Sequence, residues 1–137
     1  MCIRDRSVTV PHTIPIDKQV DLAMKLVLEG ADIIQTEGGK SSNPYNSGIQ
    51  GLLEKSVPTL SATLAIHKEF EKQLINIPIM SASGLSEVTC PLAVSCGASA
   101  VGVGSVVNKL DDLLSMIAVV RGLKESLKNS IIKEKIS

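Results

Sequence analysis

The chain has 137 residues, and its 14 basic and 14 acidic side chains give a formal net charge of zero. It therefore has no general electrostatic attraction for nucleic acid or for an anionic membrane surface. Tyr45 and Phe70 are its only aromatic residues, too few to stack on single strands. No apolar run approaches the roughly 20 residues that span a bilayer. We expect no nucleic-acid partner and no membrane span.

Residues 1–6 have neither helical nor strand periodicity. They resemble translated sequencing-adapter DNA, and we exclude them from the fold. A short native N-terminus is the alternative. With the first interpretation, native sequence begins near Ser7, inside a longer protein.

From Ser7 onward, β-branched apolar runs alternate with segments of helical periodicity. We expect strands over residues 7–10, 31–36, 77–82 and 98–103. Helices are expected over residues 17–29, 49–74, 87–95 and 110–132. Pro58 is expected to split the second helix because proline lacks an amide donor. Ser86 is expected to cap the third helix.

This β-α-β-α-β-α-β-α order predicts an α/β fold with a parallel sheet, either an open doubly wound sheet or a closed eight-stranded barrel. Alternate positions near the strand ends are small or polar: Ser7 with Thr9, Gln35 with Glu37, Ser81 with Ser83, and Gly102 with Gly104. An open sheet between helices is apolar on both faces, so this pattern favours the barrel.

A complete barrel takes about 250 residues. Residues 7–137 are therefore expected to form strands five to eight, the carboxyl-terminal half of a (βα)8 TIM barrel. Half a closed sheet leaves two strand edges unpaired. We expect the isolated chain to associate with itself through those edges.

Glycine-containing turns follow the third and fourth expected strands, Ser83-Gly84-Leu85 and Gly104-Ser105. Many TIM barrels bind phosphate with the loops after strands seven and eight and a helix N-terminus, where unpaired amides attract an anion. We predict that the amides of Gly84, Leu85, Gly104 and Ser105, with the Ser83 and Ser105 hydroxyls, bind a small phosphorylated molecule. In the alternative, these glycines only turn the chain.

Glu37 and His12 follow the second and first expected strands and are the candidate catalytic residues. Either side chain can transfer protons; alternatively, each only binds the main chain. Lys40, in the polar loop 40–48, is expected to contact the anion. Cys90 and Cys96 lack the spacing and the nearby histidines of a metal site, and the dinucleotide and Walker fingerprints are incomplete. We expect no metal and no cofactor.

Four segments carry a resemblance to a known family: residues 7–13, 31–39, 82–86 and 100–108. In these segments the sequence resembles the carboxyl-terminal half of the plastid and cyanobacterial family called hypothetical chloroplast reading frame twenty-three, over about residues 7–127. The resemblance implies an aldolase-type TIM barrel in a cyanobacterial cytoplasm or a plastid stroma. It implies no particular reaction.

Three hypotheses follow for function. The first is a barrel that binds or converts a small phosphorylated metabolite. The second is a non-catalytic ligand-binding or regulatory protein on the same scaffold, because a fold does not determine a function. The third is a truncated chain without a function of its own. Turnover of a phosphorylated compound by the full-length protein, as opposed to binding alone, distinguishes the first from the second.

Overall fold

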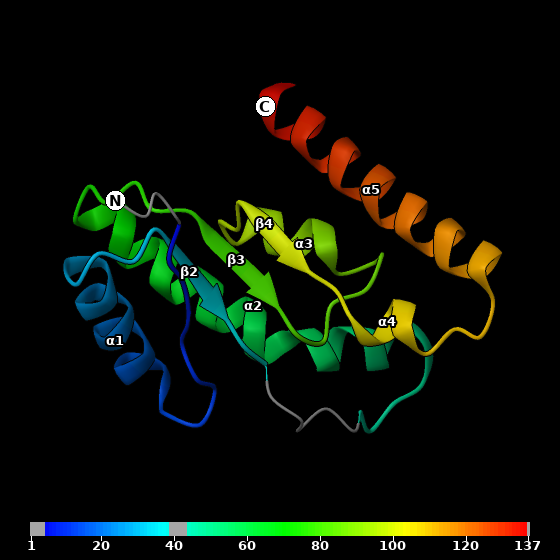
Figure 1. The fold of residues 1–137 in the computed structure, drawn as a ribbon, viewed down its shortest axis with the longest axis horizontal. Helices are drawn as coiled ribbons and strands as arrows, with labels where there is room; N and C mark the ends of the chain where they lie inside the picture. The colour runs from blue at the N-terminus through cyan, green and yellow to red at the C-terminus, as the bar shows by residue number, and fades with distance from the viewer. Residues whose placement is uncertain (1–4, 39–43, 137) are drawn as a thin grey trace.

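A computed structural model describes residues 5–38 and 44–136, with side chains described as far as residue 130. In this part of the chain the strands are β1 (Ser7–Thr9), β2 (Ile33–Thr36), β3 (Ile79–Ala82) and β4 (Ala100–Gly102). The helices are α1 (Ile16–Leu28), α2 (Gly48–Lys72), α3 (Cys90–Ser95), α4 (Ser105–Asn108) and α5 (Leu113–Ile136) (Figure 1). The four strands are parallel, in the order β1-β2-β3-β4. The predicted α/β fold with a parallel sheet is confirmed.

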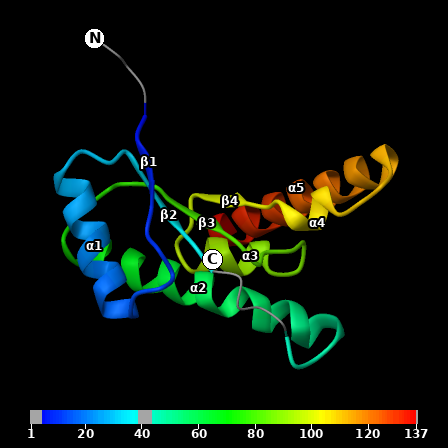
Figure 2. The same cartoon turned by 60° about the horizontal axis from the view of Figure 1, so that its bottom comes forward.

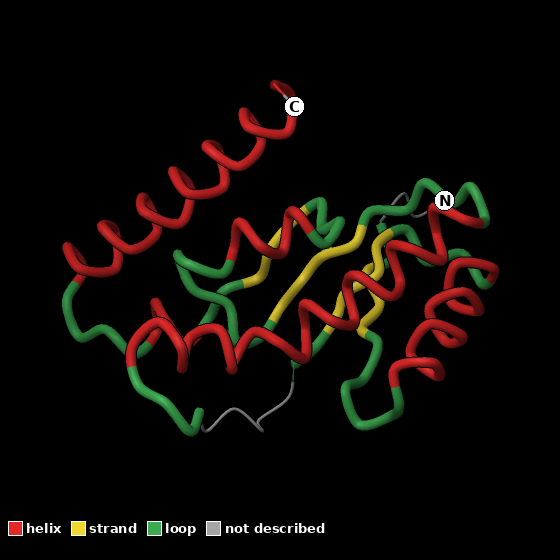
Figure 3. The backbone as a smooth tube through the Cα atoms, turned by 180° about the vertical axis from the view of Figure 1, so that it is seen from behind, coloured by secondary structure: helices red, strands yellow, loops and turns green. Residues whose placement is uncertain are grey.

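The helices α1, α2 and α3 all lie on the same face of the sheet, as the views from the front and from behind show together (Figures 1 and 3). The strand register places these residues on the opposite face: Ser7, Thr9, Ile33, Gln35, Met80, Ala82, Ala100 and Gly102. None of them is buried. Within the described ranges the sheet is therefore covered on one side only.

The register corrects one part of the sequence interpretation. Ser81 pairs with Thr36 in the neighbouring strand and lies with it on the helix-covered face; both side chains are buried. Ser81 was grouped with Ser83, as Gln35 was with Glu37, because alternate strand positions share a face and both pairs are small or polar. The paired residue on the open face is Met80, so that face is less polar than expected.

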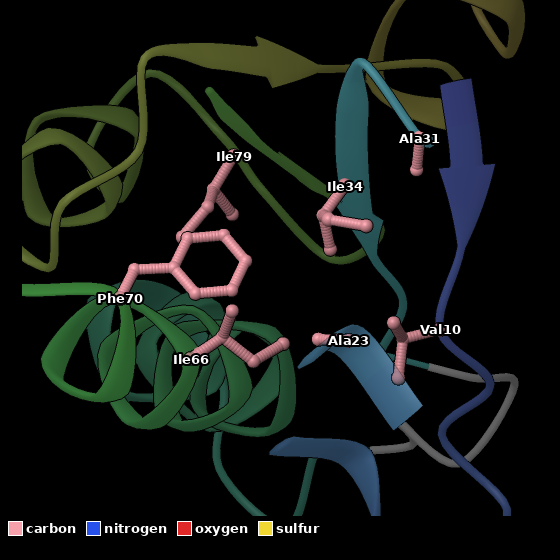
Figure 4. Packing of buried hydrophobic residues seen from close by; sticks show 7 residues of the cluster. All are labelled: Val10, Ala23, Ala31, Ile34, Ile66, Phe70 and Ile79. Carbon is pink, nitrogen blue, oxygen red and sulfur yellow. The ribbon is translucent and has the colours of Figure 1, made fainter. Parts of the chain in front are cut away.

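A hydrophobic core lies between α2 and the covered face of β2 and β3. Figure 4 shows Ile66 and Phe70 of α2 directed toward Ile34 and Ile79, and all four are at most 2% exposed. Completing this cluster are Val10, Ala23 and Ala31. Full burial of one such large side chain contributes roughly 1.5–3 kcal/mol. This core fixes α2 under the middle of the sheet.

Four buried hydroxyl groups form a second contact between α2 and the sheet. The Thr36 hydroxyl lies 2.8 Å from that of Thr59 and 3.1 Å from that of Thr63. Thr63 also donates to the Thr59 carbonyl oxygen and hydrogen-bonds to Ser81. The four side chains are at most 1% exposed. Because each hydroxyl finds a partner, these polar groups are buried without the penalty of an unsatisfied donor.

Pro58 does not split the second helix, contrary to the prediction. It lies inside α2, which continues from Gly48 to Lys72. Pro58 is exposed, so water can hydrogen-bond to the carbonyl group that its missing N–H leaves free. Buried residues lie on both sides of the proline, Ser56 before it and Thr59 and Ile66 after it, and their packing holds the helix in place.

Two helix boundaries also differ from the prediction. Ser86 does not cap α3, which begins at Cys90; the Ser86 carbonyl instead accepts hydrogen bonds from the amides of Thr89 and Cys90 in a preceding turn. The expected last helix begins later than predicted, at Leu113 of α5, and a short helix that was not predicted, α4, precedes it. The start of α5 is stabilised by Asp112, whose carboxylate accepts hydrogen bonds from the amide and hydroxyl of Ser115, as an N-cap does.

The helix α3 forms a smaller core with α5 and β4. Its buried members are Leu85, Cys90, Ala93, Ala98 and Leu123. Cys90 is fully buried, and this burial raises the pKa of its thiol to about 11. Gly97, with a φ of 104°, ends this segment beside α2, where a Cβ would collide with the imidazole ring of His67.

We predict that Thr63→Val lowers the free energy of unfolding by about 2 kcal/mol, because the hydroxyls of Thr36 and Ser81 lose a buried partner. Valine has a similar shape, so the loss is attributable to hydrogen bonding and not to a cavity. Urea unfolding monitored by circular dichroism measures the change.

Thr13→Val is the matched control, because Thr13 is exposed and we expect its replacement to change stability by less than about 0.5 kcal/mol. Equal effects of the two substitutions would contradict a stabilising role for the hydroxyl cluster.

Candidate functional site

The loops that follow β1 to β4 lie at the carboxyl edge of the sheet. Because the strands are parallel and adjacent in sequence order, their carboxyl ends meet at the same edge. Figure 2 shows this edge with β1 to β4 side by side and α4 beyond the end of β4. The described candidate site residues lie in these loops or, for Ser105, at the first position of α4: His12, Glu37, Ser83, Gly84, Leu85, Gly104 and Ser105.

His12 and Glu37, which are 25 positions apart in sequence, are hydrogen-bonded to each other. The distance from His12 Nδ1 to Glu37 Oε2 is 2.8 Å, and the His12 amide donates to the same oxygen at 3.1 Å. Their side chains are 34% and 38% exposed. The contact forms because the loop after β1 passes beside the end of β2, with the Val10 amide donating to the Gln35 carbonyl oxygen. The pair is thus fixed in place and open to solvent.

This contact determines how the imidazole ring can act. The hydrogen bonds from the His12 side chain and, secondarily, from its amide hold the pKa of Glu37 below its ordinary value. An ionised carboxylate only accepts hydrogen bonds, so His12 carries a proton on Nδ1. In the neutral ring, Nε2 is then the free acceptor, the arrangement of a positioned general base.

Sequence reasoning missed Gln19, which holds the loop that carries His12. Gln19 is 6% exposed, and its Nε2 donates to the Ile14 carbonyl oxygen at 2.9 Å. Its buried Oε1 has no partner among the described residues. Helical periodicity predicts that position 19 lies on the buried face of α1. It does not predict that a glutamine at this position hydrogen-bonds to the preceding loop.

The loop after β3 has two consecutive residues in the left-handed region. Ser83 has a φ of 79° and Gly84 a φ of 71°. For serine this conformation costs of order 1 kcal/mol or more, and such strain is frequently found at functional sites. A Cβ on Gly84 would collide with the Lys55 carbonyl oxygen, and one on Gly38 would lie 3.4 Å from the Ser83 hydroxyl. The loop is therefore held between the end of β2 and α2.

The loop after β4 differs from this. Gly104 has a φ of −122°, so it does not adopt the left-handed conformation of Ser83 and Gly84. A Cβ on Gly104 would meet only the Asn108 side-chain nitrogen, at 4.0 Å. Ser105 begins α4, a helix of four residues. The fold itself does not require glycine at position 104.

Several backbone donors at this edge have no acceptor. Within the described residues, the N–H groups of Gly84, Leu85 and Gly104 make no hydrogen bond to the backbone or to a side chain. The amide of Ser105 is at the first position of α4, where no carbonyl precedes it in the helix. The Leu85 side chain is buried at 3% exposure, which anchors its segment to the core. The predicted phosphate donors are thus available at two adjacent strand ends.

Lys40 lies outside the described residues. In the part of the chain that is described, no group of three His, Cys, Asp or Glu side chains is arranged to hold a metal ion. None of the helices there is sufficiently long and apolar to cross a bilayer.

Comparisons of sequence place these features in a family. The family model described as "Protein of unknown function (DUF561)" matches residues 3–133. The protein "Uncharacterized protein ycf23" of Pyropia yezoensis is 36% identical, over 95% of this chain and 50% of its own length. That of Porphyra purpurea is 36% identical over 95% and 51%, and that of Cyanidium caldarium 34% over 87% and 46%. The chain spans about half the length of the curated relatives it matches.

A comparison of structures finds the chain titled "Wild-type GGGPS from Thermoplasma volcanium", a TIM barrel, with a TM-score of 0.59 and 16% sequence identity. The similarity covers 83% of this chain and 38% of that one. It concerns the fold alone. The ycf23 relatives confirm the resemblance to the chloroplast reading frame family, and the chain belongs to the family described as DUF561.

Proposed function

We propose that this chain binds a small phosphorylated metabolite at the carboxyl edge of its sheet, as the second half of a (βα)8 barrel. The phosphate group binds between the loops after β3 and β4, which correspond to barrel strands seven and eight. These are the loops that, with a short extra helix, hold phosphate in many TIM barrels. Here the short helix after β4 is α4.

The observation that carries this proposal is the set of backbone donors without acceptors. The amides of Gly84 and Leu85 follow one strand, and those of Gly104 and Ser105 follow its neighbour. Leu85 is buried and Gly84 is half-buried; such amides are ordinarily hydrogen-bonded, so an anion is a suitable acceptor. Gly104 and Ser105 are exposed, so a ligand can reach their amides. The open space around Gly104 supports the proposal, because it leaves a path for a ligand to approach the backbone.

Three observations support the half-barrel interpretation. The sheet is covered by helices on one side only. The chain spans about half the length of its ycf23 relatives, and a TIM barrel has a similar fold. In a closed barrel the open face would be the interior. The outer edges of β1 and β4 would pair with strands of the amino-terminal half. The ycf23 relatives also support a location in a plastid stroma or a cyanobacterial cytoplasm.

The Glu37–His12 hydrogen bond favours a second candidate function, proton transfer to or from the bound metabolite. Both residues lie at the same edge of the sheet as the proposed phosphate loops. The carboxylate accepts the Nδ1 hydrogen bond and so orients the ring, as the acid does in other catalytic pairs. The alternative is a ligand-binding or regulatory protein without catalysis. Such a protein requires only the phosphate-binding loops after β3 and β4.

The first test replaces Gly104 by valine. We use a full-length chimera, in which residues 7–137 replace the matching half of the ycf23 protein of Pyropia yezoensis. Gly104→Val is expected to weaken binding of inorganic phosphate and of a sugar phosphate at least tenfold, because the side chain covers the loop amides. Titration calorimetry measures the affinity. The fold is expected to persist, since a Cβ at position 104 would meet only the Asn108 side-chain nitrogen, at 4.0 Å.

Ala118→Val is the matched control, because Ala118 is exposed on α5 and distant in sequence from the loops. It is expected to leave phosphate affinity unchanged. Phosphate binding by Gly104→Val with the affinity of the unsubstituted chimera would refute the assignment.

The second test concerns the pKa of Glu37. In His12→Ala, loss of the side-chain hydrogen bond should raise this pKa toward its ordinary value of 4.5. A carboxyl group whose pKa is lowered in the folded state stabilises the fold when the pH is above the group's ordinary pKa. That stabilisation is lost as the pH falls through the lowered pKa. Carbon NMR titration of the carboxyl group measures the shift. Glu54, whose pKa is lowered by Asn46, is the internal control and should not change.

If Glu37 titrates at the same pH in the chain with His12 and in His12→Ala, the pair is not coupled in solution. Substitutions of either residue that leave turnover unchanged, once a reaction is identified, would contradict proton transfer.

The third test concerns the free edges of β1 and β4. The isolated chain is expected to self-associate, since unpaired parallel strands readily bind further strands. Size-exclusion chromatography over a range of concentrations, with circular dichroism, measures this. A stable, well-folded monomer would contradict the half-barrel proposal.

A further inference from the structure

The helix α5 has two apolar stripes, and only one of them is packed. Val119, Leu123 and Leu127 recur at intervals of four residues and contact the core formed with α3. Leu123 is 7% exposed. A helix with one such stripe needs one neighbour, and α3 already supplies it.

The second stripe consists of Leu113, Ile117 and Val120, at positions i, i+4 and i+7. These side chains are 69%, 39% and 50% exposed. Ile117 and Val120 line a shallow groove of about 400 Å³, together with Met116, Arg121 and Lys124. Contiguous apolar groups of this kind on a surface mark a site of contact with another segment or protein.

The position of α5 shows on which side this contact can occur. The helix lies at the outer edge of the fold, beyond β4 and α3, and its amino-terminal part extends past the sheet (Figures 1 and 2). The strand β4 is the last in the sheet order. The free edge of the sheet and the helix with the second stripe therefore lie at the same end of the molecule.

The length of the relatives indicates what covers the stripe. This chain spans about half of each ycf23 protein. In a (βα)8 barrel, the helices form an outer ring around the strands. Each helix in such a ring has two neighbours. The neighbour of the last helix, other than the helix before it, is the first helix of the barrel.

We propose that the stripe of Leu113, Ile117 and Val120 is the docking surface for the first helix of the amino-terminal half of the full-length protein. This inference rests on the half-barrel proposal. The docked helix presents an apolar face, and carboxylates at its border face Arg121 and Lys124. Neither of these cations forms an ion pair with a described carboxylate, so both are available to it.

The test compares one substitution in two proteins, the 137-residue chain and the full-length chimera. Val120→Asn places an amide in the middle of the stripe. In the isolated chain Val120 is half exposed, so the unfolding midpoint should change little. In the chimera the same substitution buries a polar group against the docked helix and should lower the midpoint by about 5 °C. Differential scanning calorimetry measures both.

Ala118→Asn is the matched control, on the same helix but off the stripe and exposed. Its intrinsic effect on the helix is expected to be the same in both proteins. Hydrogen exchange provides a second measurement: amides of residues 113–121 should exchange at least tenfold more slowly in the chimera than in the isolated chain.

An equal effect of Val120→Asn in the two proteins, or no added protection in the chimera, would overturn the proposal. So would an isolated chain whose dimerisation is abolished by Val120→Asn, because a second copy would then cover the stripe. Phosphate affinity is measured on the same chimera. If phosphate fails to bind while the context-dependent loss of stability is observed, the proposed function fails and the docking surface stands.

Discussion

The position of α2 against β2 and β3 is the constraint on which the candidate site depends. Its hydroxyl cluster joins Thr36 at the end of β2 to Ser81 near the end of β3 through Thr59 and Thr63. Glu37 directly follows Thr36, and Ser83 lies two residues after Ser81. A movement of α2 would therefore displace both the carboxylate and the strained loop. Short side chains allow the helix to approach the sheet closely while every hydroxyl remains bonded.

The order of the elements was predictable from the sequence because hydrophobic periodicity reflects burial on one face. Ile34 and Ile79, for example, occur in short β-branched runs and are buried in the sheet. The orientation of Ser81 was not predictable. A serine is normally assigned to the polar face, and its partner Thr63 is 18 positions away in sequence. The same limitation applies to Pro58, whose effect depends on the packing of the rest of α2.

Much of the candidate site follows from one property of parallel sheets, that all carboxyl ends share an edge. This property was sufficient to place His12, Glu37, Gly84 and Gly104 in neighbouring loops. It did not determine that His12 and Glu37 are hydrogen-bonded, since that depends on the path of the loop after β1. The positive φ of Ser83 was also unpredictable, because serine has no intrinsic preference for it. The contact from Gln19 is likewise a tertiary feature.

The burial of Cys90 allows local opening of the small core around α3 to be measured without an added label. Its thiol is inaccessible, and the raised pKa keeps it protonated at neutral pH, whereas only a thiolate reacts rapidly with alkylating reagents. Cys96, two residues after Val94, is partly exposed. Burial also raises the pKa of Cys96, so accessibility distinguishes the two thiols. Cys96 can be alkylated on the folded protein, while alkylation of Cys90 requires α3 to separate from α5 and β4. The ratio of the two alkylation rates therefore reports how often this end of the fold opens locally.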